Sequence, residues 1–306
     1  MCTFVETPDV KLLIDAGVAL GPRSRRLPHP REYQARNECR ARIRTYAAKA
    51  DAVVISHYHN DHHTPNYTEN VWLGSSADEA EEIYREKTVL AKDIRNAINF
   101  NQRRRGWMFQ RFVKRIGSRC EIADGKSFEF GSTRIKLSQP VPHGEDGSEL
   151  GWVLMTCVRS GEETFLHASD VQGPMSKETT QMILQEKPDF LVLGGPPTYL
   201  EGVRVGQASI RAGIENAARI ASRTPIVLFE HHILRSEQWR EHSKPVYEAA
   251  SSAEHSVMTA AEYLKTPIML LESQRERLYE EEAPSPEFVK WTELHREKRR
   301  LQNPPV

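Results

Sequence analysis

Four side chains that can bind a metal ion lie within the six-residue stretch His57-Tyr58-His59-Asn60-Asp61-His62. The stretch has the form H-x-H-x-D-H, and it follows an apolar run at residues 52–55 that is typical of a strand. Imidazole nitrogens beside a carboxylate suit zinc and its neighbours in the first transition row. A strand that presents such a loop in a cleft is a common support for a catalytic metal. The pattern therefore favours a metal centre over a solvated polar loop.

Further potential ligands share one position, directly after an apolar segment. They are His143 after residues 133–139, Asp170 after 164–168, and His231 and His232 after 225–229. Any one of them taken alone is equally well explained as a turn residue or a helix cap. Together they could complete a two-metal site, because two ions need about seven protein ligands whereas a structural site closes with about four.

The elements that must position these residues alternate irregularly. Strands are expected at residues 10–15, 52–56, 71–74, 119–123, 127–130, 133–139, 152–158, 164–168, 190–193 and 225–229. Helices are expected at 28–50, 75–116, 177–185, 207–222 and 236–251, and in two runs between 272 and 301. Because hairpins are mixed with helical connections, the order favours a layered sandwich with helices outside over a doubly wound parallel sheet.

Composition and charge narrow the kind of protein further. The 306 residues carry 42 basic and 42 acidic side chains, so overall charge points to neither nucleic acid nor membrane. No apolar stretch is long enough to span a membrane, and the first residues lack a signal-peptide pattern. The cysteines are dispersed, which fits reduced thiols in the cytoplasm. Motifs for dinucleotide binding, phosphate loops and serine hydrolases are missing from the sequence.

The ordered set of Asp15-x-Gly17, the motif at 57–62, His143, Asp170 and His231 resembles the metallo-β-lactamase superfamily over about residues 10–235. Within it, the chain looks like an uncharacterised, largely archaeal group of predicted metal-dependent hydrolases. The shared stretches are Leu-Ile-Asp-Ala-Gly-Val at 13–18, His-His-Thr-Pro at 62–65, Leu-Gly-Gly-Pro-Pro at 193–197 and His-His-Ile-Leu-Arg at 231–235.

The resemblance implies an α/β fold, a four-layer αβ/βα sandwich with the metals at one edge between two sheets. Extra helices are expected after the metal motif and at the C-terminus. We expect one metallo-β-lactamase-like domain over residues 1–271, with a helical insertion at about 75–118, and a charged helical extension over 272–306. The family usually has a β-hairpin before the Asp-x-Gly strand, but only about nine residues precede that strand in this chain. Either residues 2–6 form a short edge strand or an N-terminal piece is missing.

The resemblance also implies a role for each ligand. The first metal would be held by His57, His59 and His143; the second would be held by Asp61, His62 and His231; Asp170 would bridge both. A histidine at position 59 favours two zinc ions, with manganese, iron or nickel as alternatives. Arg235, four residues after His231, favours His231 over His232, although both stay open. Asp15 would orient the metal loop through hydrogen bonds.

The expected activity is that of a dinuclear zinc-dependent hydrolase that attacks its substrate with a metal-bridging hydroxide. Asp61 and Asp170 are the catalytic candidates for taking the proton released. His63 and His232 are candidate proton donors, and each is also explained as a supporting or surface histidine. Tyr199, in the loop after residues 190–193, could approach an oxyanion, although a plain tight loop explains that segment equally well.

Two basic stretches bear on the substrate. Residues 95–119 contain eight basic and no acidic side chains with four aromatic residues among them, and residues 23–49 carry nine basic and two acidic side chains. Such stretches can bind phosphate groups, but amphipathic helices with inward aromatics and solvated arginines explain most of them better. The leading hypothesis is a phosphoesterase that could act on nucleic acid. The alternatives are a hydrolase of a small ester, thioester or lactone, and a non-catalytic metal-containing binding protein; self-association into a homo-oligomer stays open.

Overall fold

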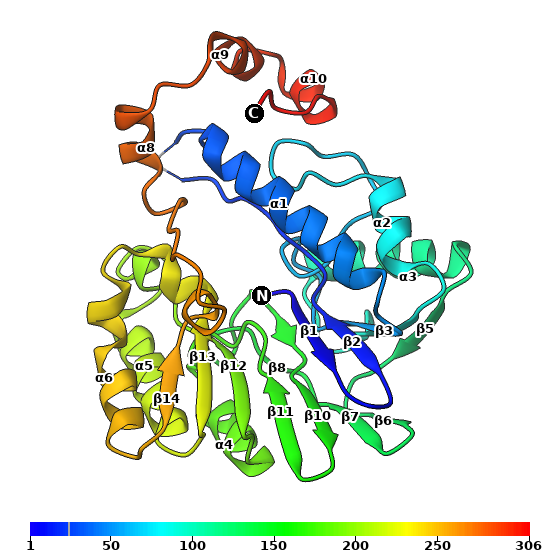
Figure 1. Cartoon of the computed structure of the whole chain (residues 1–306), viewed down its shortest axis with the longest axis vertical. Coiled ribbons are helices and arrows are strands. Elements are labelled where there is room, and N and C mark those ends of the chain that lie inside the picture. Colours follow the sequence, from blue (N-terminus) through cyan, green and yellow to red (C-terminus); the bar gives the residue numbers. More distant parts are fainter. Residues whose placement is uncertain (24) are drawn as a thin grey trace.

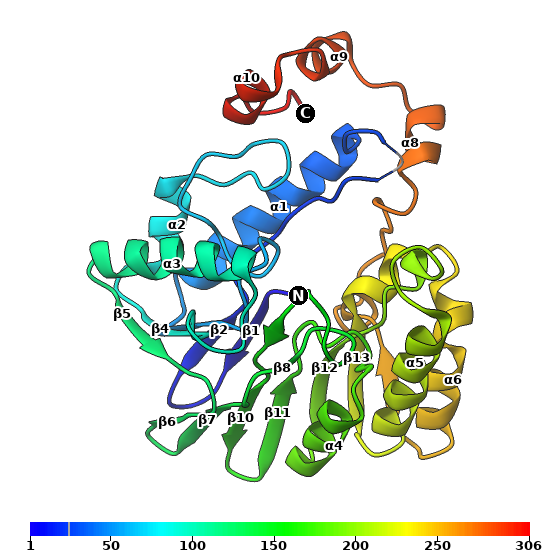
Figure 2. The ribbon, with the colours of Figure 1, turned by 180° about the vertical axis from the view of Figure 1, so that it is seen from behind.

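The computed structural model describes residues 1–23 and 25–306, and its centre is a pair of β-sheets with helices on their outer faces (Figures 1 and 2). The first sheet has the order β1-β2-β3-β4-β5, with strands Thr3–Glu6, Lys11–Ile14, Ala52–Ile55, Thr88–Ala91 and Arg119–Ile122. The β1–β2 pair is antiparallel, and the other neighbours are parallel. Residues near the N-terminus therefore do form the short edge strand that was one of the two expected alternatives.

The second sheet has the order β14-β13-β12-β11-β10-β7-β6. In chain order its strands are β6 Ser127–Phe130, β7 Thr133–Leu137, β10 Thr156–Ser160, β11 Glu163–His167, β12 Phe190–Gly194, β13 Ile226–Glu230 and β14 Ser256–Met258. The half from β6 to β11 is antiparallel, whereas β11 to β14 are parallel. A small ribbon of β8 Val141–Pro142 and β9 Trp152–Val153 lies beside it.

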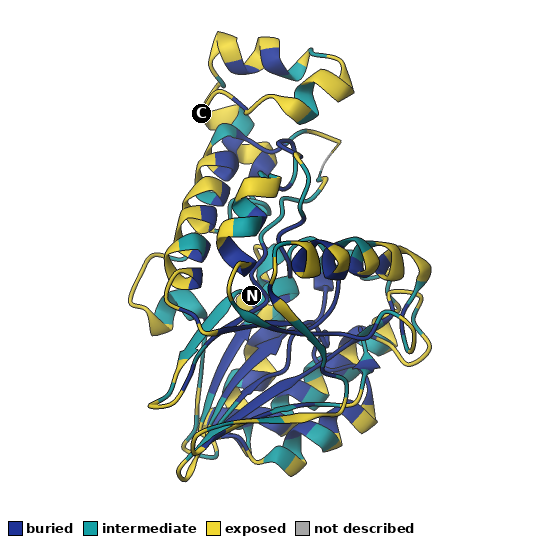
Figure 3. Ribbon diagram, turned by 90° about the vertical axis from the view of Figure 1, so that its right-hand side faces the viewer, coloured by how far each residue is buried: buried dark blue, intermediate teal, exposed yellow. Residues whose placement is uncertain are grey.

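The helices cover both outer faces. Those that pack on the first sheet are α1 Pro30–Ala47, α2 Ala77–Tyr84 and α3 Phe100–Arg115; those on the second are α4 Lys177–Glu186, α5 Gln207–Ala221 and α6 Trp239–Ser251. The short helix α7 spans Ala260–Tyr263, and the 3₁₀ turns η1 and η2 span Thr198–Leu200 and His231–Arg235. Buried residues fill the central strands of both sheets and the inner faces of these helices (Figure 3). None of the helices in the described part of the chain has both the length and the apolar character needed to span a membrane.

Alternation along single strands explains the layers. In β3, Val53 and Ile55 pack with α1, α2 and α3, whereas Ala52 and Val54 face the second sheet and pack with residues such as Ile135. Successive side chains of a strand point to opposite faces, so a strand buried on both faces is apolar throughout. The four-layer αβ/βα sandwich expected from the sequence is confirmed.

Two local predictions are wrong. The expected helix over 75–116 is interrupted by β4, so the segment at 75–118 is not a purely helical insertion. A four-residue apolar run cannot be assigned by its periodicity, and here parallel pairing with β3 and β5 decides it. Residues 71–74 form a turn instead of a strand, because the Glu69 carboxylate accepts hydrogen bonds from the backbone N–H groups of Trp72 and Leu73. The strands β4, β8 and β14 and helix α7 were not expected.

The C-terminal extension is packed onto the domain. It contains α8 Arg275–Glu281, α9 Pro286–Thr292 and α10 Arg296–Leu301, which arch over α1 (Figure 1). Fully buried Arg275 donates two 2.8 Å hydrogen bonds to the Glu32 carboxylate of α1. Further along, Phe288 and Trp291 bury their rings against Tyr33 of α1 and Val71. The helical extension is thus held by one buried ion pair and one aromatic cluster.

Replacing Arg275 with methionine should lower the free energy of unfolding by about 3–5 kcal/mol, because Glu32 would be left buried without its cation. Urea denaturation measures the change. Arg277→Met, two residues along α8, is the matched control. Its ion pairs to Glu237 and Glu281 are half exposed at 3.5 and 3.9 Å, so its cost should stay below about 1 kcal/mol. Equal losses in the two variants would show that the buried pair does not hold the extension.

Candidate metal centre

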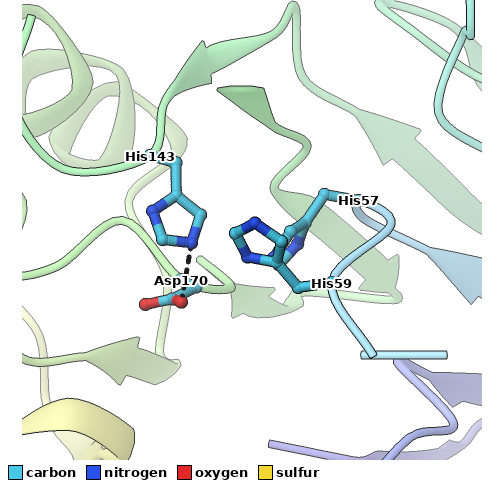
Figure 4. A group of neighbouring side chains, drawn as sticks. All are labelled: His57, His59, His143 and Asp170. Atoms are coloured by element: carbon cyan, nitrogen blue, oxygen red, sulfur yellow. Dashed lines mark hydrogen bonds and ion pairs between the residues drawn. The ribbon is translucent and has the colours of Figure 1, made fainter. Parts of the chain in front are cut away.

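The candidate ligands come from four strand ends that meet at one edge of the sandwich. The H-x-H-x-D-H loop begins two residues after β3, His143 follows β8, Asp170 lies three residues after β11, and His231 follows β13 directly. The first three of these strand ends bring His57, His59, His143 and Asp170 face to face (Figure 4). The structure therefore brings together the residues that were singled out for their positions after strands, whereas metal binding by these residues stays a prediction.

One group of donors consists of His57, His59, His143 and Asp170. Each offers a ligand atom, and these four atoms lie within 4.8 Å of one another. The Nε2 atom of His57 is 3.2 Å from Nδ1 of His59, and Nε2 of His143 is 2.8 Å from Oδ2 of Asp170. Three imidazoles and one carboxylate so close together form a donor set suited to a first-row transition metal.

A second group consists of Asp61, His62 and His231, whose ligand atoms also lie within 4.8 Å of one another. From Oδ2 of Asp61, Nε2 of His231 is 3.7 Å away and Nε2 of His62 is 3.9 Å away. Asp170 adjoins this group as well, since its Oδ2 is 3.3 Å from Nε2 of His231 and 4.0 Å from Nε2 of His62. The Asp170 carboxylate therefore lies between the two groups.

Unpartnered polar atoms show that this cluster fits metal ions. Nε2 of His62 and Oδ1 of Asp170 are buried and have no hydrogen-bond partner among the described residues. Nε2 of His143 and Nε2 of His231 are also buried, and each has the Oδ2 atom of Asp170 within 3.3 Å. Leaving such atoms unsatisfied is costly, and buried polar groups in folded proteins are nearly always satisfied. A cation at each group would satisfy all four atoms at once.

The protonation states also suit metal binding. Burial lowers the pKa of His57 and His231 well below the ordinary value, so both rings are neutral and their lone pairs are available. Burial acts to raise the pKa of Asp61, but the interactions with the neighbouring His62 ring and with the guanidinium of Arg235 outweigh it and hold that pKa below the usual range. Neutral imidazole and ionised carboxylate are the forms that bind a metal.

Asp15 ties the cluster together from beneath. Its Oδ1 accepts a 2.8 Å hydrogen bond from the backbone N–H of Ser56, and its Oδ2 accepts from the Ser56 hydroxyl at 2.6 Å, from Nδ1–H of His62 at 2.8 Å and from the Ser169 hydroxyl at 3.2 Å. A proton on Nδ1 leaves Nε2 of His62 free as the ligand atom. Gly17 lies directly under the same loop, because a Cβ there would come within 2.4 Å of the backbone nitrogen of His63.

The two adjacent histidines after β13 occupy different places. His231 groups with Asp61 and His62, and it also groups with Asp170 and His232. Nε2 of His232 lies 3.2 Å from Oδ2 of Asp170, and its Nδ1 lies 3.0 Å from the Tyr199 hydroxyl. His231 adopts a positive φ of 68°, which turns consecutive side chains to different partners. The nearness of His231 to Asp61 favours it as the ligand, and His232, which links Asp170 to Tyr199, stays the alternative.

Arg235 contacts a carboxylate of the cluster, whereas His63 packs against aromatic rings. Arg235 lies 3.6 Å from Oδ2 of Asp61 and donates a 3.3 Å hydrogen bond to the Tyr199 hydroxyl. The ring of His63 instead packs against Tyr58 and Phe109, and its Nδ1 lies 2.9 Å from the backbone oxygen of His59. His63 belongs to none of the metal-binding groups found in residues 1–23 and 25–306.

Sequence reasoning missed several supporting residues. Gln172 places its amide nitrogen 3.3 Å from Nδ1 of His143, and Gln102 of α3 lies 3.4 Å from Nε2 of His59. Ser56 and Ser169 complete the hydrogen bonds of Asp15. Ser56, Ser169 and Gln172 adjoin predicted ligands in the sequence and could have been suspected. Gln102 carries no local signal, because only the packing of α3 brings it to the cluster.

Comparison with solved structures places the fold in a class. The protein has the metallo-β-lactamase fold. It superposes on the metallo-β-lactamase fold protein YhfI from Bacillus subtilis with a TM-score of 0.50 and 16% identity, covering 85% of this chain and 89% of YhfI. It also superposes on the diiron β-hydroxylase CmlA from Streptomyces venezuelae with a TM-score of 0.51 and 14% identity, covering 84% of this chain and about half, 51%, of CmlA. No family model matches the chain.

Curated relatives then identify the family. The UPF0282 protein of Methanopyrus kandleri is 39% identical over 283 residues, covering 92% of this chain and 95% of the relative. The UPF0282 protein of Thermococcus sibiricus is 38% identical over 297 residues, covering 95% and 94%. The chain belongs to the UPF0282 family, and the resemblance to a largely archaeal group with this fold is confirmed.

Asp15→Asn should weaken binding of an ion at the Asp61–His62–His231 group by about 10- to 100-fold, because the amide cannot match the carboxylate that orients His62. Titration with zinc, followed by calorimetry, measures the affinity. Asp9→Asn is the matched control, since Asp9 is an exposed aspartate whose carboxylate accepts hydrogen bonds from Ser132 and Thr133 instead of from the metal loop. Unchanged zinc affinity in Asp15→Asn would remove its orienting role.

Proposed function

We propose that this protein is a metal-dependent hydrolase with a dinuclear site. The observation that carries the proposal is the convergence of seven side chains from four strand ends, among whose donor atoms Nε2 of His62 and Oδ1 of Asp170 are buried without a hydrogen-bond partner in the described chain. In this assignment the first ion is held by His57, His59 and His143, and the second by Asp61, His62 and His231, with Asp170 shared. When bound, the ions supply Lewis acidity and activate water. Imidazole-rich ligation supports zinc, and manganese, iron or nickel are the alternatives.

Side chains of the protein would accept the proton released from water and donate a proton to the leaving group. Asp61 is the proposed acceptor, because its side chain is 26% exposed and so reaches solvent, whereas Asp170 is 2% exposed. On the other side of Asp170, the hydrogen-bonded pair of His232 and Tyr199 is the candidate donor to the leaving group. His63 drops out of this role, since its ring packs away from the cluster.

The proposed substrate class is a phosphate ester. Arg235, beside Asp61, places a guanidinium next to the second group of ligands, and Arg23 lies 4.6 Å over the ring of Tyr199. A guanidinium recognises phosphate oxygens through charge-assisted hydrogen bonds, and it stabilises the charge that develops in transfer. A neutral ester, thioester or lactone needs no such cation, so hydrolysis of these compounds is the alternative.

The surface of α3 bears on whether the substrate is a nucleic acid. Phe109 and Phe112 are buried as expected, but Phe100 and Trp107 are 79% and 52% exposed beside the exposed arginines of this helix. Exposed aromatic rings among cations can stack on unpaired bases. This arrangement supports single-stranded nucleic acid as one form of the phosphate ester.

Metal content is the first test. The wild-type protein, purified without added metal, should contain two ions per chain, and His62→Ala should contain about one or fewer, because the second group would lose one of its three ligands. Elemental analysis by mass spectrometry measures both. His242→Ala on α6, a histidine that belongs to none of the metal-binding groups of the described chain, is the matched control and should retain two. One ion or none in wild type, unaffected by His62→Ala, would favour a non-catalytic binding protein.

Substrate class is tested on the metal-loaded protein. Bis(p-nitrophenyl) phosphate should be hydrolysed, and Asp61→Asn should reduce kcat by about 100-fold or more, in the range expected for loss of general base catalysis. Hydrolysis of p-nitrophenyl acetate or a thioester without phosphodiester cleavage would establish the alternative class. Binding of a single-stranded RNA oligonucleotide should weaken steeply as salt rises if α3 contacts its phosphates.

A further inference from the structure

A pocket separate from the metal centre lies against the outer side of the metal loop. Its volume is about 370 Å³, and its walls come from the metal loop, the segment after it, α3 and α10. The lining residues are Asn60, His63, Pro65, Asn66, Tyr67, Asn101, Arg104, Arg105, Met108, Phe109 and Arg300. None of the seven proposed ligands lines it. Its size is that of a site for a small organic molecule.

The pocket is strongly basic. Arg104, Arg105 and Arg300 line it, whereas no acidic side chain does so within the described chain. The guanidinium of Arg104 makes no ion pair or hydrogen bond with any residue the structure describes, and that of Arg105 donates only a long 3.4 Å bond to the backbone oxygen of Tyr58. Arg300 contacts one carboxylate, that of Glu297, at 3.5 Å on the exposed side of α10. Much of the hydrogen-bonding capacity of these guanidinium groups is therefore unused.

Tyr67 lines the same pocket as these three arginines. Burial raises the pKa of its hydroxyl, and the charge of Glu69 acts in the same direction, whereas the charges of Arg105, Arg300 and Arg104 act in the opposite direction. The hydroxyl stays protonated and would add a neutral donor beside the arginines.

The positions of the arginines are set by regular structure. Asn101, Arg104, Arg105 and Met108 have the spacing i, i+3, i+4, i+7, which places them on one face of α3. The first turn of α3 contains no acidic residue, so its free N–H groups add positive potential at Asn101. Arg300 is positioned by its backbone, because its carbonyl oxygen accepts a 2.9 Å hydrogen bond from the N–H of Asn70.

The facing wall is held by a buried arginine. Arg40 of α1 donates to the Thr64 hydroxyl at 2.7 Å, to the Leu73 carbonyl at 2.9 Å and to the Val18 carbonyl at 3.0 Å. These bonds hold the segment that carries Pro65, Asn66 and Tyr67, although it has no regular structure. A preformed basic pocket loses little ordering entropy when an anion binds.

We propose that this pocket binds a phosphate group, either as the free ion or as part of a small phosphate ester. Arg104, Arg105 and Arg300 would donate to its oxygens, with Tyr67 and the amides of Asn60 and Asn101 as neutral donors. Met108, Phe109 and Pro65 offer an apolar wall to an organic group of the ester. The C-terminal extension completes this site, because Arg300 is its contribution. The inference goes beyond the proposed hydrolase activity and does not depend on it.

Calorimetric titration of the full-length protein as purified, with inorganic phosphate and separately with adenosine 5′-monophosphate, tests the proposal. Arg104→Gln and Arg300→Gln should each weaken binding at least about tenfold, since each removes a charge-assisted donor. Both variants should fold, because neither guanidinium holds the structure together. Tighter binding of the nucleotide than of phosphate identifies an ester as the ligand, and equal binding identifies the free ion.

Matched controls remove the same charge outside the pocket. One control is Arg111→Gln on α3, where the Arg111 guanidinium covers the Trp107 ring. The other is Lys298→Gln on the exposed surface of α10. Each control should change the affinity less than about twofold. Phosphate binding that is lost in His62→Ala but unaffected by Arg104→Gln and Arg300→Gln would place the ion at the metal centre and overturn the proposal. No detectable binding of either probe to the wild-type protein would do the same. Metal counts are measured separately, so failure of the metal centre and failure of this pocket are distinguishable.

Discussion

The carboxylate of Asp15 is the interaction on which the arrangement of the site depends. Asp15 directly follows β2, Ser56 and His62 belong to the segment after β3, and Ser169 belongs to the loop after β11 in the opposite sheet. One fully buried side chain therefore joins both sheets and the metal loop through charge-assisted hydrogen bonds, which are stronger than neutral ones. A positive φ of 54° at Asp15 turns its carboxylate beneath the loop, and Gly17 leaves room for the loop above.

Two buried arginines hold the segments beside this centre to α1. Arg40 holds the segment after the metal loop to α1, and Arg275 holds the extension to the same helix. Between them, the extension and the segment meet where the backbone of Arg300 bonds to Asn70. Through Arg300, helix α10 of the extension is therefore part of the pocket wall beside the metal loop. The boundary at 271–272 marks a change in composition, and the contacts of Arg275 cross it.

The chain shows clearly which features a sequence can predict. Spacing alone identifies His57, His59, Asp61 and His62, because a dense cluster of ligand types directly after a strand rarely arises by chance. The single residues His143, Asp170 and His231 were predicted because each directly follows an apolar segment and because their order resembles that of the metallo-β-lactamase superfamily. The sandwich followed from the mixture of hairpins and helical connections.

What could not be predicted depends on tertiary contacts. The four residues of β4 have no periodicity of their own, and only their neighbours in the sheet make them a strand. Gln102 reaches the metal centre through the packing of α3. Arg300 lies almost 200 residues beyond Arg104 in the chain, so their meeting in one pocket depends on how the extension docks. The different roles of His231 and His232 follow from one backbone angle, which residue types do not reveal.

The origin of the ligands in both halves of the sandwich has a consequence for the lifetime of the protein. Ions that join residues from β3 to residues from β11 and β13 would act as removable cross-links between the two sheets. Because such ions bind the native state and not the unfolded chain, their free concentration adds directly to the free energy of unfolding. Loss of metal would therefore lower the stability of the protein as well as its activity. It would loosen one half of the sandwich from the other and expose the chain to proteolysis, so that abundance of the protein follows the supply of its metal.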